Sequence, residues 1–366
     1  MPDLRIVKLA QVLVHYSLAL KAGDKLLIGT TPAAAPLLRE VYREALLAGA
    51  HPIPRIGLEG LDELLFRYGS PQQIQFIPDT VRQEVETVDA QLGIEASENT
   101  RALTGADPQK IALRRRATRD LQQRFMERDA AGELRWCVTL FPTNAAAQDA
   151  EMSLADYEDF VYGAGKLDAD DPVAAWQRTS AAQQRIADYL GTRRVIHLVA
   201  PDTDLTYHTA GRAWINADGR KNFPDGEVFT SPDETATEGH IRFSYPAVFS
   251  GREVEDVRLW FEGGRVVKAT AAKGEELLHS LLDMDEGARR LGEAAFGTNY
   301  NIQRFSRNTL FDEKIGGTIH LALGAAFPEI GGQNTSALHW DLVCDMRQGE
   351  AYADGELFYK EGTFLI

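Results

Sequence analysis

The sequence has only two cysteines and no long apolar run among its 366 residues. Cys137 and Cys344 each stand within an apolar stretch, which predicts two small buried side chains rather than a disulfide framework and favours a cytoplasmic location. No stretch approaches the ~20 apolar residues of a membrane span. Residues 1–25 lack the pattern of a secretory signal and predict an amphipathic helix. No membrane partner is therefore expected.

Positive charge is also scarce. The chain has 39 Lys and Arg against 54 Asp and Glu, a net charge of −15. Phosphate contacts need clustered Lys and Arg, so no nucleic-acid partner is expected. The one basic cluster, at residues 114–116 with Arg119, shares its helical stretch with Asp120 and Glu127. We interpret this cluster as a solvated helix face.

Residues 1–187 alternate between short apolar runs and helical patterns but lack a nucleotide-binding motif. Apolar runs at 25–29, 52–56 and 136–141 predict strands, and the pattern at 37–47 predicts a helix between the first two. The loop at 29–33 has neither G-x-G-x-x-G nor G-x-x-x-x-G-K-[ST]. The sequence therefore predicts an α/β domain with a mostly parallel sheet, serving as scaffold and dimer surface.

Residues 188–366 change to strands separated by turns, after a predicted connecting helix at 172–190. The runs that predict strands lie at 195–200, 257–261, 265–269, 318–322 and 338–343. The second and third of these flank Glu262-Gly263-Gly264, which predicts a hairpin. One helix is predicted from about Glu275 to Leu291. This half therefore predicts an α+β, largely antiparallel domain, and we expect it to be the catalytic, metal-binding one.

Two histidines and an aspartate stand in predicted strands of this half. Residues i and i+2 of a strand face the same side, so His339 and Asp341 project together from an otherwise apolar run. His320 lies mid-strand between glycines. Either these groups bind a metal ion, or they are a satisfied core histidine and a histidine–aspartate hydrogen bond at a sheet edge.

Two glutamates in the same half are further candidates. Glu227 follows a Pro-Asp-Gly turn and enters a short predicted strand, although a solvated turn residue would show the same pattern. Glu293 stands among glycines and alanines, where we expect it to close the predicted helix.

The charge of this set predicts how many ions it holds. Glu227, Glu293 and Asp341 with neutral His320 and His339 carry −3, so one divalent ion leaves −1 and two leave +1. Nitrogen and oxygen donors without a thiolate suit Zn²⁺, Co²⁺ or Mn²⁺. Two such ions can activate a bridging water and polarise a carbonyl, so the set favours a dinuclear hydrolytic centre.

Several motifs of this half resemble the thermophilic aminopeptidase family, which includes aminopeptidase T and aminopeptidase S. The similarity runs over about residues 195–365. The motifs are Pro224-Asp225-Gly226-Glu227 with the following VFTSP, Leu291-Gly292-Glu293, Phe311-Asp312-Glu313-Lys314 with Gly317, Thr318 and His320, and His339-x-Asp341.

This resemblance implies a metalloaminopeptidase. The family holds two metal ions with residues that match Glu227, Glu293, His320, His339 and Asp341, removes N-terminal residues from peptides and forms homodimers. We expect a bridging hydroxide to attack the scissile carbonyl, with Glu293 or Glu313 as the carboxylate that transfers the proton.

One position of this chain departs from the family. The family places a tyrosine at the active site seven residues after the first histidine, and Phe327 stands there, where we expect it to contact substrate. A phenylalanine lacks the hydroxyl that could hydrogen-bond to a tetrahedral intermediate, and loss of one such donor can cost ~10²-fold in rate.

Two alternatives remain open on the sequence. Dihydroxypyridine dioxygenases resemble this family in fold and use one Fe(II), a site that His320, His339 and Asp341 could supply. Retention of Glu227 and Glu293 argues against that mononuclear site. The other alternative is a metal-bearing, weakly active peptide-binding homologue.

Overall fold

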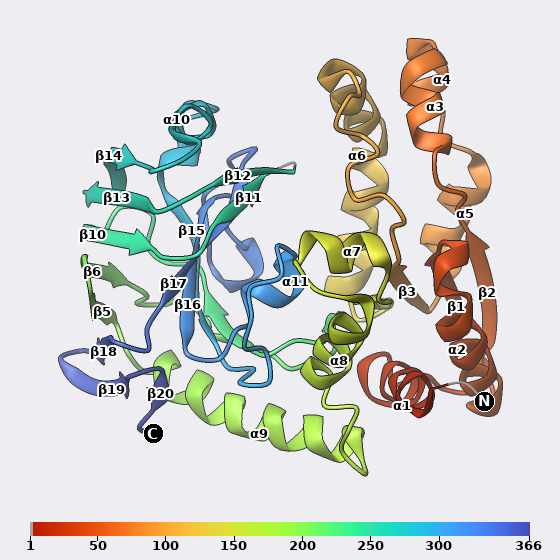
Figure 1. Cartoon of the computed structure of the whole chain (residues 1–366), viewed down its shortest axis with the longest axis horizontal. Helices are drawn as coiled ribbons and strands as arrows, with labels where there is room; N and C mark the ends of the chain where they lie inside the picture. The colour runs from red at the N-terminus through yellow and green to blue at the C-terminus, as the bar shows by residue number, and fades with distance from the viewer. Residues whose placement is uncertain (1–2, 250) are drawn as a thin grey trace. The chain divides into compact units, whose positions relative to one another are not determined.

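The computed structural model describes residues 3–249 and 251–366, and the chain divides into two compact units. The first unit runs to Ala174 and includes Gly219–Pro224. The second comprises Ala175–Asp218 and Asp225–Ile366. The chain therefore passes between the units three times (Figure 1).

The first unit is built around a five-stranded parallel sheet with the strand order β2-β1-β3-β4-β8. Its strands are β1 (Lys25–Thr30), β2 (His51–Ile56), β3 (Ala90–Glu95), β4 (Arg135–Leu140) and β8 (Asn222–Phe223). Its helices are α1 (Leu4–Val12), α2 (Ala35–Leu47), α3 (Leu61–Tyr68), α4 (Pro71–Gln75), α5 (Asp79–Thr87), α6 (Pro108–Ala130), α7 (Asn144–Asp149) and α8 (Leu154–Ala164). The predicted parallel α/β arrangement is confirmed.

The sequence patterns missed two strands of this sheet. β3 lies at the centre of the sheet, yet its sequence AQLGIE is short and interrupted by a glycine. β8 has two residues and pairs with β4 through Val138 and Thr139, although more than 80 residues separate them in sequence. Such a pairing depends on the tertiary fold and has no local pattern.

The second unit contains two larger antiparallel sheets and a two-stranded ribbon. One sheet has the order β14-β13-β10-β6-β5-β18-β19-β20, and the other β17-β16-β15-β9-β7. The eight-stranded sheet consists of β5 (Val195–Ala200), β6 (Thr203–His208), β10 (Glu238–Phe243), β13 (Val257–Glu262), β14 (Arg265–Thr270), β18 (Glu350–Ala353), β19 (Glu356–Lys360) and β20 (Thr363–Phe364). The five-stranded sheet consists of β7 (Ile215–Ala217), β9 (Glu227–Thr230), β15 (Leu291–Gly297), β16 (Thr318–Gly324) and β17 (His339–Asp345). The ribbon is β11 (Ala247–Phe249) with β12 (Arg252–Val254).

One hydrophobic core joins both sheets of this unit with its helices. Leu205 and Ile241 come from the larger sheet, and Leu321 and Leu342 from the smaller one. The helices are α9 (Pro172–Gly191), α10 (Glu275–Leu282) and α11 (Thr309–Asp312), and the first two add side chains such as Leu190 and Leu278 to the core. The predicted α+β, largely antiparallel arrangement is confirmed.

The helix predicted from Glu275 to Leu291 is too long. α10 ends at Leu282, and Glu293 lies inside strand β15 instead of closing a helix. The nearly continuous run of small and apolar residues in LGEAAFG suits a strand buried on both faces, and all seven residues of β15 are buried. The helical reading of Glu293 was therefore wrong.

The two cysteines lie in the interior of the protein, as their apolar surroundings in the sequence predict. Cys137 is 1% exposed and Cys344 3% exposed. Among the helices of the described residues, none combines the length and the apolar character required to cross a bilayer.

Candidate metal centre

The five side chains predicted from the sequence to be metal ligands come together on four neighbouring strands. Glu227 begins β9, Glu293 lies on β15 and His320 on β16, and His339 and Asp341 lie on β17. The opposite face of this sheet is apolar, since Phe296, Leu321 and Leu342 belong to the core. The alternation of each strand thus separates a polar face from the core.

Small residues leave space among the ligands. Ala322 pairs with both Glu293 and Asp341, and residues that pair directly in a sheet face the same side. Gly324 pairs with His339, and Gly297 with Glu227. A larger side chain at Ala322 would enter the space between Glu293 and Asp341. A Cβ at Gly297 or Gly324 would instead lie 2.1 Å from the carbonyl oxygen of Ile315 or Leu338, so these glycines allow close approach of backbones.

A β-bulge aims Glu293 toward the site. The register between β15 and β16 shifts between Leu291 and Glu293. A side chain at Gly292 would place its Cβ 2.1 Å from the carbonyl oxygen of Ala325, so only glycine allows this close approach of backbones.

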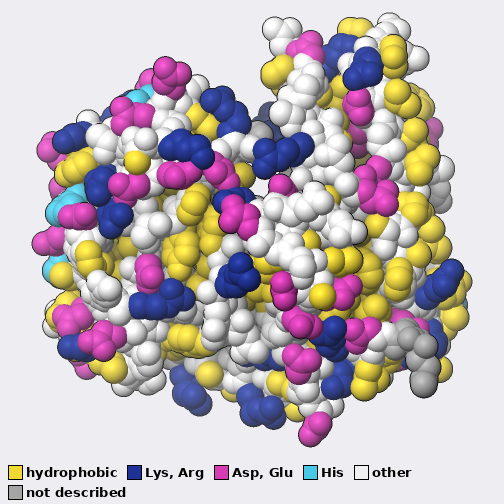
Figure 2. Space-filling view, viewed as in Figure 1, with side chains coloured by type: hydrophobic (Ala, Val, Ile, Leu, Met, Phe, Trp, Pro, Cys, Tyr) yellow, Lys and Arg dark blue, Asp and Glu magenta, His cyan; other side chains and the backbone are white. Residues whose placement is uncertain are grey.

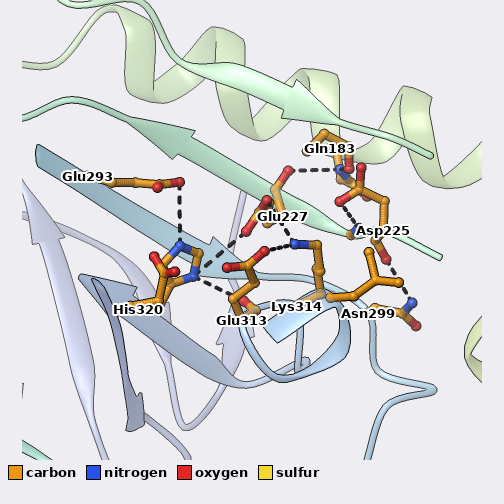
Figure 3. A network of polar contacts seen from close by, with 12 residues as sticks. Gln183, Asp225, Glu227, Glu293, Asn299, Glu313, Lys314 and His320 are labelled. Atoms are coloured by element: carbon orange, nitrogen blue, oxygen red, sulfur yellow. Dashed lines mark hydrogen bonds and ion pairs between the residues drawn. The ribbon is translucent and has the colours of Figure 1, made fainter. Parts of the chain in front are cut away.

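A second tight approach fixes Glu227. Gly226 has φ +128°, and a Cβ there would lie 2.7 Å from Cβ of Asn299. Nδ2 of Asn299 donates to the carbonyl of Asp225 over 2.8 Å, and Nε2 of Gln183 donates to the carbonyl of Glu227 over 3.1 Å (Figure 3). The backbone around Glu227 is thereby held on both sides.

Both histidines present Nε2 to the site. Nδ1 of His320 lies 3.1 Å from the carbonyl oxygen of Glu313, and Nδ1 of His339 lies 2.9 Å from that of Ala325. A carbonyl accepts only, so each Nδ1 carries the hydrogen and a neutral ring keeps its lone pair on Nε2. This is the usual arrangement of a metal-binding histidine.

The donor atoms form groups that could each hold an ion. Glu227, Glu293 and His320 offer atoms within 4.8 Å of one another, and so do Glu293, His339 and Asp341. A third group consists of Glu313, His320 and Asp341. The first two groups share Glu293, whose Oε1 lies 3.4 Å from Nε2 of His320 and whose Oε2 lies 3.3 Å from Nε2 of His339.

Several of these atoms lack the hydrogen bonds that burial demands. Oε2 of Glu227, Nε2 of His320 and Oδ1 of Asp341 are buried without a hydrogen-bond partner among the described residues. Leaving a buried charged group unsatisfied costs several kcal/mol, ~2–7 for a polar group alone. Such donors of nitrogen and oxygen type, converging on one region, fit divalent metal ions.

The site also carries excess negative charge. Glu227, Glu293, Glu313 and Asp341 contribute four negative charges, and Lys314 contributes the only buried positive one among these residues. With neutral imidazoles the sum is −3. Because an uncompensated buried charge is costly, this charge favours the binding of cations from outside the chain.

The protonation of the site without metal reflects this charge. Burial opposes a charged ring at His320, but the carboxylates of Glu293, Glu227 and Glu313 outweigh it and raise the pKa to about 10. Burial likewise opposes a charge on His339, yet Asp341 and Glu293 raise its pKa to about 11. Without metal, protons therefore take the place of cations at these two imidazoles.

Lys314 is a component of the site to which the sequence analysis gave no role. Its side chain is fully buried, its ammonium contacts Oε1 of Glu313, and Nζ lies 3.4 Å from Oε1 of Glu227 (Figure 3). Burial lowers the pKa of Lys314, but Glu227 and Glu313 outweigh burial and raise it above the ordinary value. The charged run Asp312-Glu313-Lys314 resembles a solvated turn in sequence, and only the apolar flanks Phe311 and Ile315 signal burial.

Glu313 and Phe327 both lie beside the donor groups. The side chain of Glu313 is 15% exposed, and its partial burial raises the pKa of its carboxyl. The ring of Phe327 stands nearly perpendicular to that of His339, with centroids 5.6 Å apart, and packs on Phe229 with centroids 5.3 Å apart. The position at which the family resemblance implies a tyrosine is thus adjacent to a predicted ligand.

A cavity of about 130 Å³ lies beside the centre, within the second unit. Glu313, His339 and Asp341 reach it from the donor groups. The rest of its wall is largely apolar and aromatic and consists of Pro246, Ala247, Val248, Phe249, Phe305, Arg307, Thr309, Asp312, Trp340 and Val343. A small organic group therefore has access to the predicted ligands.

Comparison with known proteins places this chain in a family. The sequence matches the family described as thermophilic metalloprotease (M29) over residues 3–364. The chain belongs to this M29 family. Aminopeptidase T from Thermus thermophilus is 30% identical, with 97% of this chain and 95% of that protein covered. Aminopeptidase 2 from Geobacillus stearothermophilus is 30% identical, with 88% and 83% covered.

A solved M29-like structure shares the whole fold. Wild-type AmpT from Thermus thermophilus matches with a TM-score of 0.86 and 25% identity, and 99% of each chain is covered. The family and fold predicted from the sequence motifs are confirmed. M29 membership makes this chain a metalloprotease, and the His, Glu and Asp groups described above are its candidate metal-binding groups.

Proposed function

We propose that this chain is a dinuclear metalloaminopeptidase, with Glu227, Glu293, His320, His339 and Asp341 as the ligands. The observation that carries the proposal is the sharing of Glu293 by two donor groups that each contain one histidine. Two divalent ions, Zn²⁺, Co²⁺ or Mn²⁺, would lower the pKa of a water between them to form a bridging hydroxide and polarise the scissile carbonyl. The names of the aminopeptidase relatives support peptides as substrates.

Glu313 is the better of the two candidates for proton transfer. Both oxygens of Glu293 face imidazole nitrogens, so Glu293 serves as a ligand. Oε1 of Glu313 contacts Lys314, which leaves Oε2 to accept a proton from the attacking water and to return it to the leaving amine. Glu313 also lines the cavity beside the centre, where a substrate can reach it.

The alternative with a single Fe(II) fits the geometry less well. A two-histidine, one-carboxylate site needs His320 and His339 on the same ion. Among the described residues, no candidate group contains both histidines, because each faces a different oxygen of Glu293.

Metal content and hydrolysis test this proposal together. We expect two ions per chain in the freshly purified protein and hydrolysis of Leu- and Phe-p-nitroanilide. Glu227→Ala and His339→Ala should each lose an ion and most of the hydrolysis. Normal hydrolysis by both variants, or one iron per chain with O₂ uptake, would overturn the proposal.

We also propose that the chain forms a homodimer through an apolar surface of the first unit. Among the described residues, nineteen large hydrophobic side chains are exposed, and ten of them lie between residues 42 and 76. They are Tyr42, Leu46, Leu47, Ile53, Ile56, Leu58, Leu61, Leu64, Tyr68 and Phe76, and we call them the apolar surface. In Figure 2, hydrophobic side chains run along the right-hand edge, where Figure 1 shows β2 and α3. A concentration of this kind is typical of a protein interface.

Side chains, rather than added strands, would form this interface. β2 is the edge strand, and the backbone N–H of His51 donates toward β1 over 2.7 Å to the carbonyl of Asp24. The alternate positions, Pro52 and Pro54, face outward and have no N–H to offer.

A further inference from the structure

Lys314 is held in the centre by its own backbone. It lies in the loop between α11 and β16, where its N–H donates to the carbonyl of Phe311 over 3.1 Å and its carbonyl accepts from the N–H of Asn299 over 3.0 Å. The side chain then reaches inward between Glu227 and Glu313 (Figure 3). The position of this ammonium is therefore set by the fold.

The two carboxylate oxygens of Glu227 have different environments, because only Oε1 lies near the ammonium of Lys314. Oε1 lies 3.4 Å from Nζ of Lys314. Oε2 is buried without a hydrogen-bond partner and lies 3.7 Å from Nδ1 of His320. Only one oxygen of Glu227 is thus free to ligate an ion, and the other is engaged with Lys314.

The same ammonium restrains Glu313. Glu313 is near enough to His320 and Asp341 to form a metal-binding group with them, so proximity alone would allow it to become a ligand. The ion pair with Lys314 restrains Oε1 of Glu313 and neutralises the negative charge of this carboxylate beside the centre. A carboxylate restrained in this way can remain outside the ligand set and stay available for proton transfer.

We propose that Lys314 is a positioning residue that keeps Glu313 out of the metal ligand set and limits Glu227 to one ligand oxygen. This inference rests on the proposed dinuclear aminopeptidase function. Its distinctive consequence concerns metal binding. Removal of the ammonium makes the metal-free centre more negative by one charge and releases Glu313, so ions should bind at least as tightly while turnover falls.

The experiment uses the full chain loaded with Co²⁺, whose visible absorption reports the number and type of ligands. We expect Lys314→Met to retain two Co²⁺ per chain and to show weaker visible bands, because an added carboxylate ligand raises the coordination number. We expect kcat to fall about 100-fold, since a displaced general base typically costs ~10²–10⁴. KM should change less than about threefold, since substrate binding does not involve Lys314.

A double variant separates positioning from simple loss of structure. Lys314→Met combined with Glu313→Gln should restore the wild-type cobalt spectrum, because an amide is a poor ligand, without restoring kcat. The matched control is Lys273→Met, which removes an exposed lysine that also contacts two carboxylates, those of Glu253 and Glu255. We expect this control to keep the wild-type spectrum and kcat.

Three results with Lys314→Met would overturn the proposed positioning role of Lys314. A wild-type spectrum for Lys314→Met, a kcat within threefold of wild type, or loss of the ions from a folded variant would each do so. If Lys314→Met does not fold by circular dichroism, Lys314→Gln, which keeps a donor without charge, is measured instead and must show the same spectral change. Failure of the wild-type protein to bind two Co²⁺ or to hydrolyse anilides rejects the proposed function itself, which is a separate result.

Discussion

Glu293 lies between His320 and His339, with one carboxylate oxygen 3.4 Å from Nε2 of the first and the other 3.3 Å from Nε2 of the second. The two carboxylate oxygens of Glu293 therefore belong to different donor groups, one with His320 and the other with His339. Burial opposes ionisation of Glu293, but the neighbouring imidazoles of His320 and His339 outweigh it and lower the pKa of this carboxyl. A charged carboxylate in this position can bind an ion on each side.

Replacement of Glu293 should affect both ions at once. Glu293→Gln keeps the shape of the side chain but removes its charge and one ligand oxygen. We expect metal content to fall to one ion per chain or less and kcat/KM for Leu-p-nitroanilide to fall about 100-fold or more. Elemental analysis and initial rates check this. Glu262→Gln, on the exposed β13–β14 turn, is the control and should behave as wild type.

Replacement of His339 should affect only one ion. His339→Ala removes a ligand from the group with Glu293 and Asp341 but leaves the group of Glu227, Glu293 and His320 complete. We expect one ion per chain to remain, with hydrolysis reduced about 100-fold. Two bound ions in this variant would contradict the assignment of His339.

Metal removal should make stability depend on pH. In the metal-free protein the pKa values of His320 and His339 rise from 6.5 to about 10 and about 11. Protonated imidazoles therefore stabilise the fold fully below pH 6.5, and this contribution disappears as pH rises through the folded-state values. The melting temperature of chelated protein should thus fall between pH 6.5 and 10.

The metal-loaded protein supplies the comparison. Ions compete with protons for the same nitrogens, so the rise in melting temperature on adding metal should be larger at pH 9 than at pH 6.5. Differential scanning fluorimetry at both pH values measures it. Equal melting temperatures of the chelated protein at these two pH values would contradict the prediction.

Phe327 is the position most open to a gain of activity. Its ring packs against that of His339, so Phe327→Tyr should place a hydroxyl beside the centre. We expect kcat to rise about tenfold, part of the ~10²-fold that one oxyanion donor can contribute, with KM nearly unchanged. Phe327→Leu, which adds no hydroxyl, is the control.

The same substitution addresses the weakly active alternative. A wild-type protein that binds peptides but hydrolyses anilides barely, and a Phe327→Tyr variant that hydrolyses them readily, would favour a peptide-binding homologue. If Phe327→Tyr and Phe327→Leu leave kcat equally unchanged, the residue at this position has no bearing on turnover.

The apolar surface predicts the state of association. Leu47 and Ile56 are 73% and 56% exposed, so Leu47→Asp with Ile56→Asp should leave the fold intact while placing charges in the proposed interface. We expect a dimer to become a monomer by light scattering after gel filtration. Leu365→Asp, 56% exposed in the second unit, is the control. A wild-type monomer at micromolar concentration would refute the proposed dimer.

The sequence predicted the parts of the fold that have local patterns. The hairpin of β13 and β14 follows from its Gly-Gly turn, and the strand with His339 and Asp341 from its alternation. β15 was mistaken for the end of a helix because buried strands read as continuous runs of small and apolar residues. The bulge at Gly292 that aims Glu293 arises from pairing with β16, which no local pattern reports.

Within the site, the identity of the ligand residues was easier to predict than their arrangement in space. The five proposed ligands were named from chemistry and motif, and they lie together on one sheet face. The division of Glu293 between two histidines depends on three strands that meet only in the fold. The burial of Lys314 depends on the loop that anchors its backbone to Phe311 and Asn299. Its charged sequence neighbours instead predict a solvated turn.

The threefold passage of the chain between the units limits how the protein can be dissected. Gly219–Pro224, which includes β8, belongs to the first unit, yet it lies between two segments of the second. A fragment that begins at residue 175 would carry a strand of the other unit's sheet, and a fragment that ends at 174 would lack it. A single protease cut near residue 174 should therefore leave two pieces that remain associated, so a shared unfolding transition is to be expected even from the nicked protein.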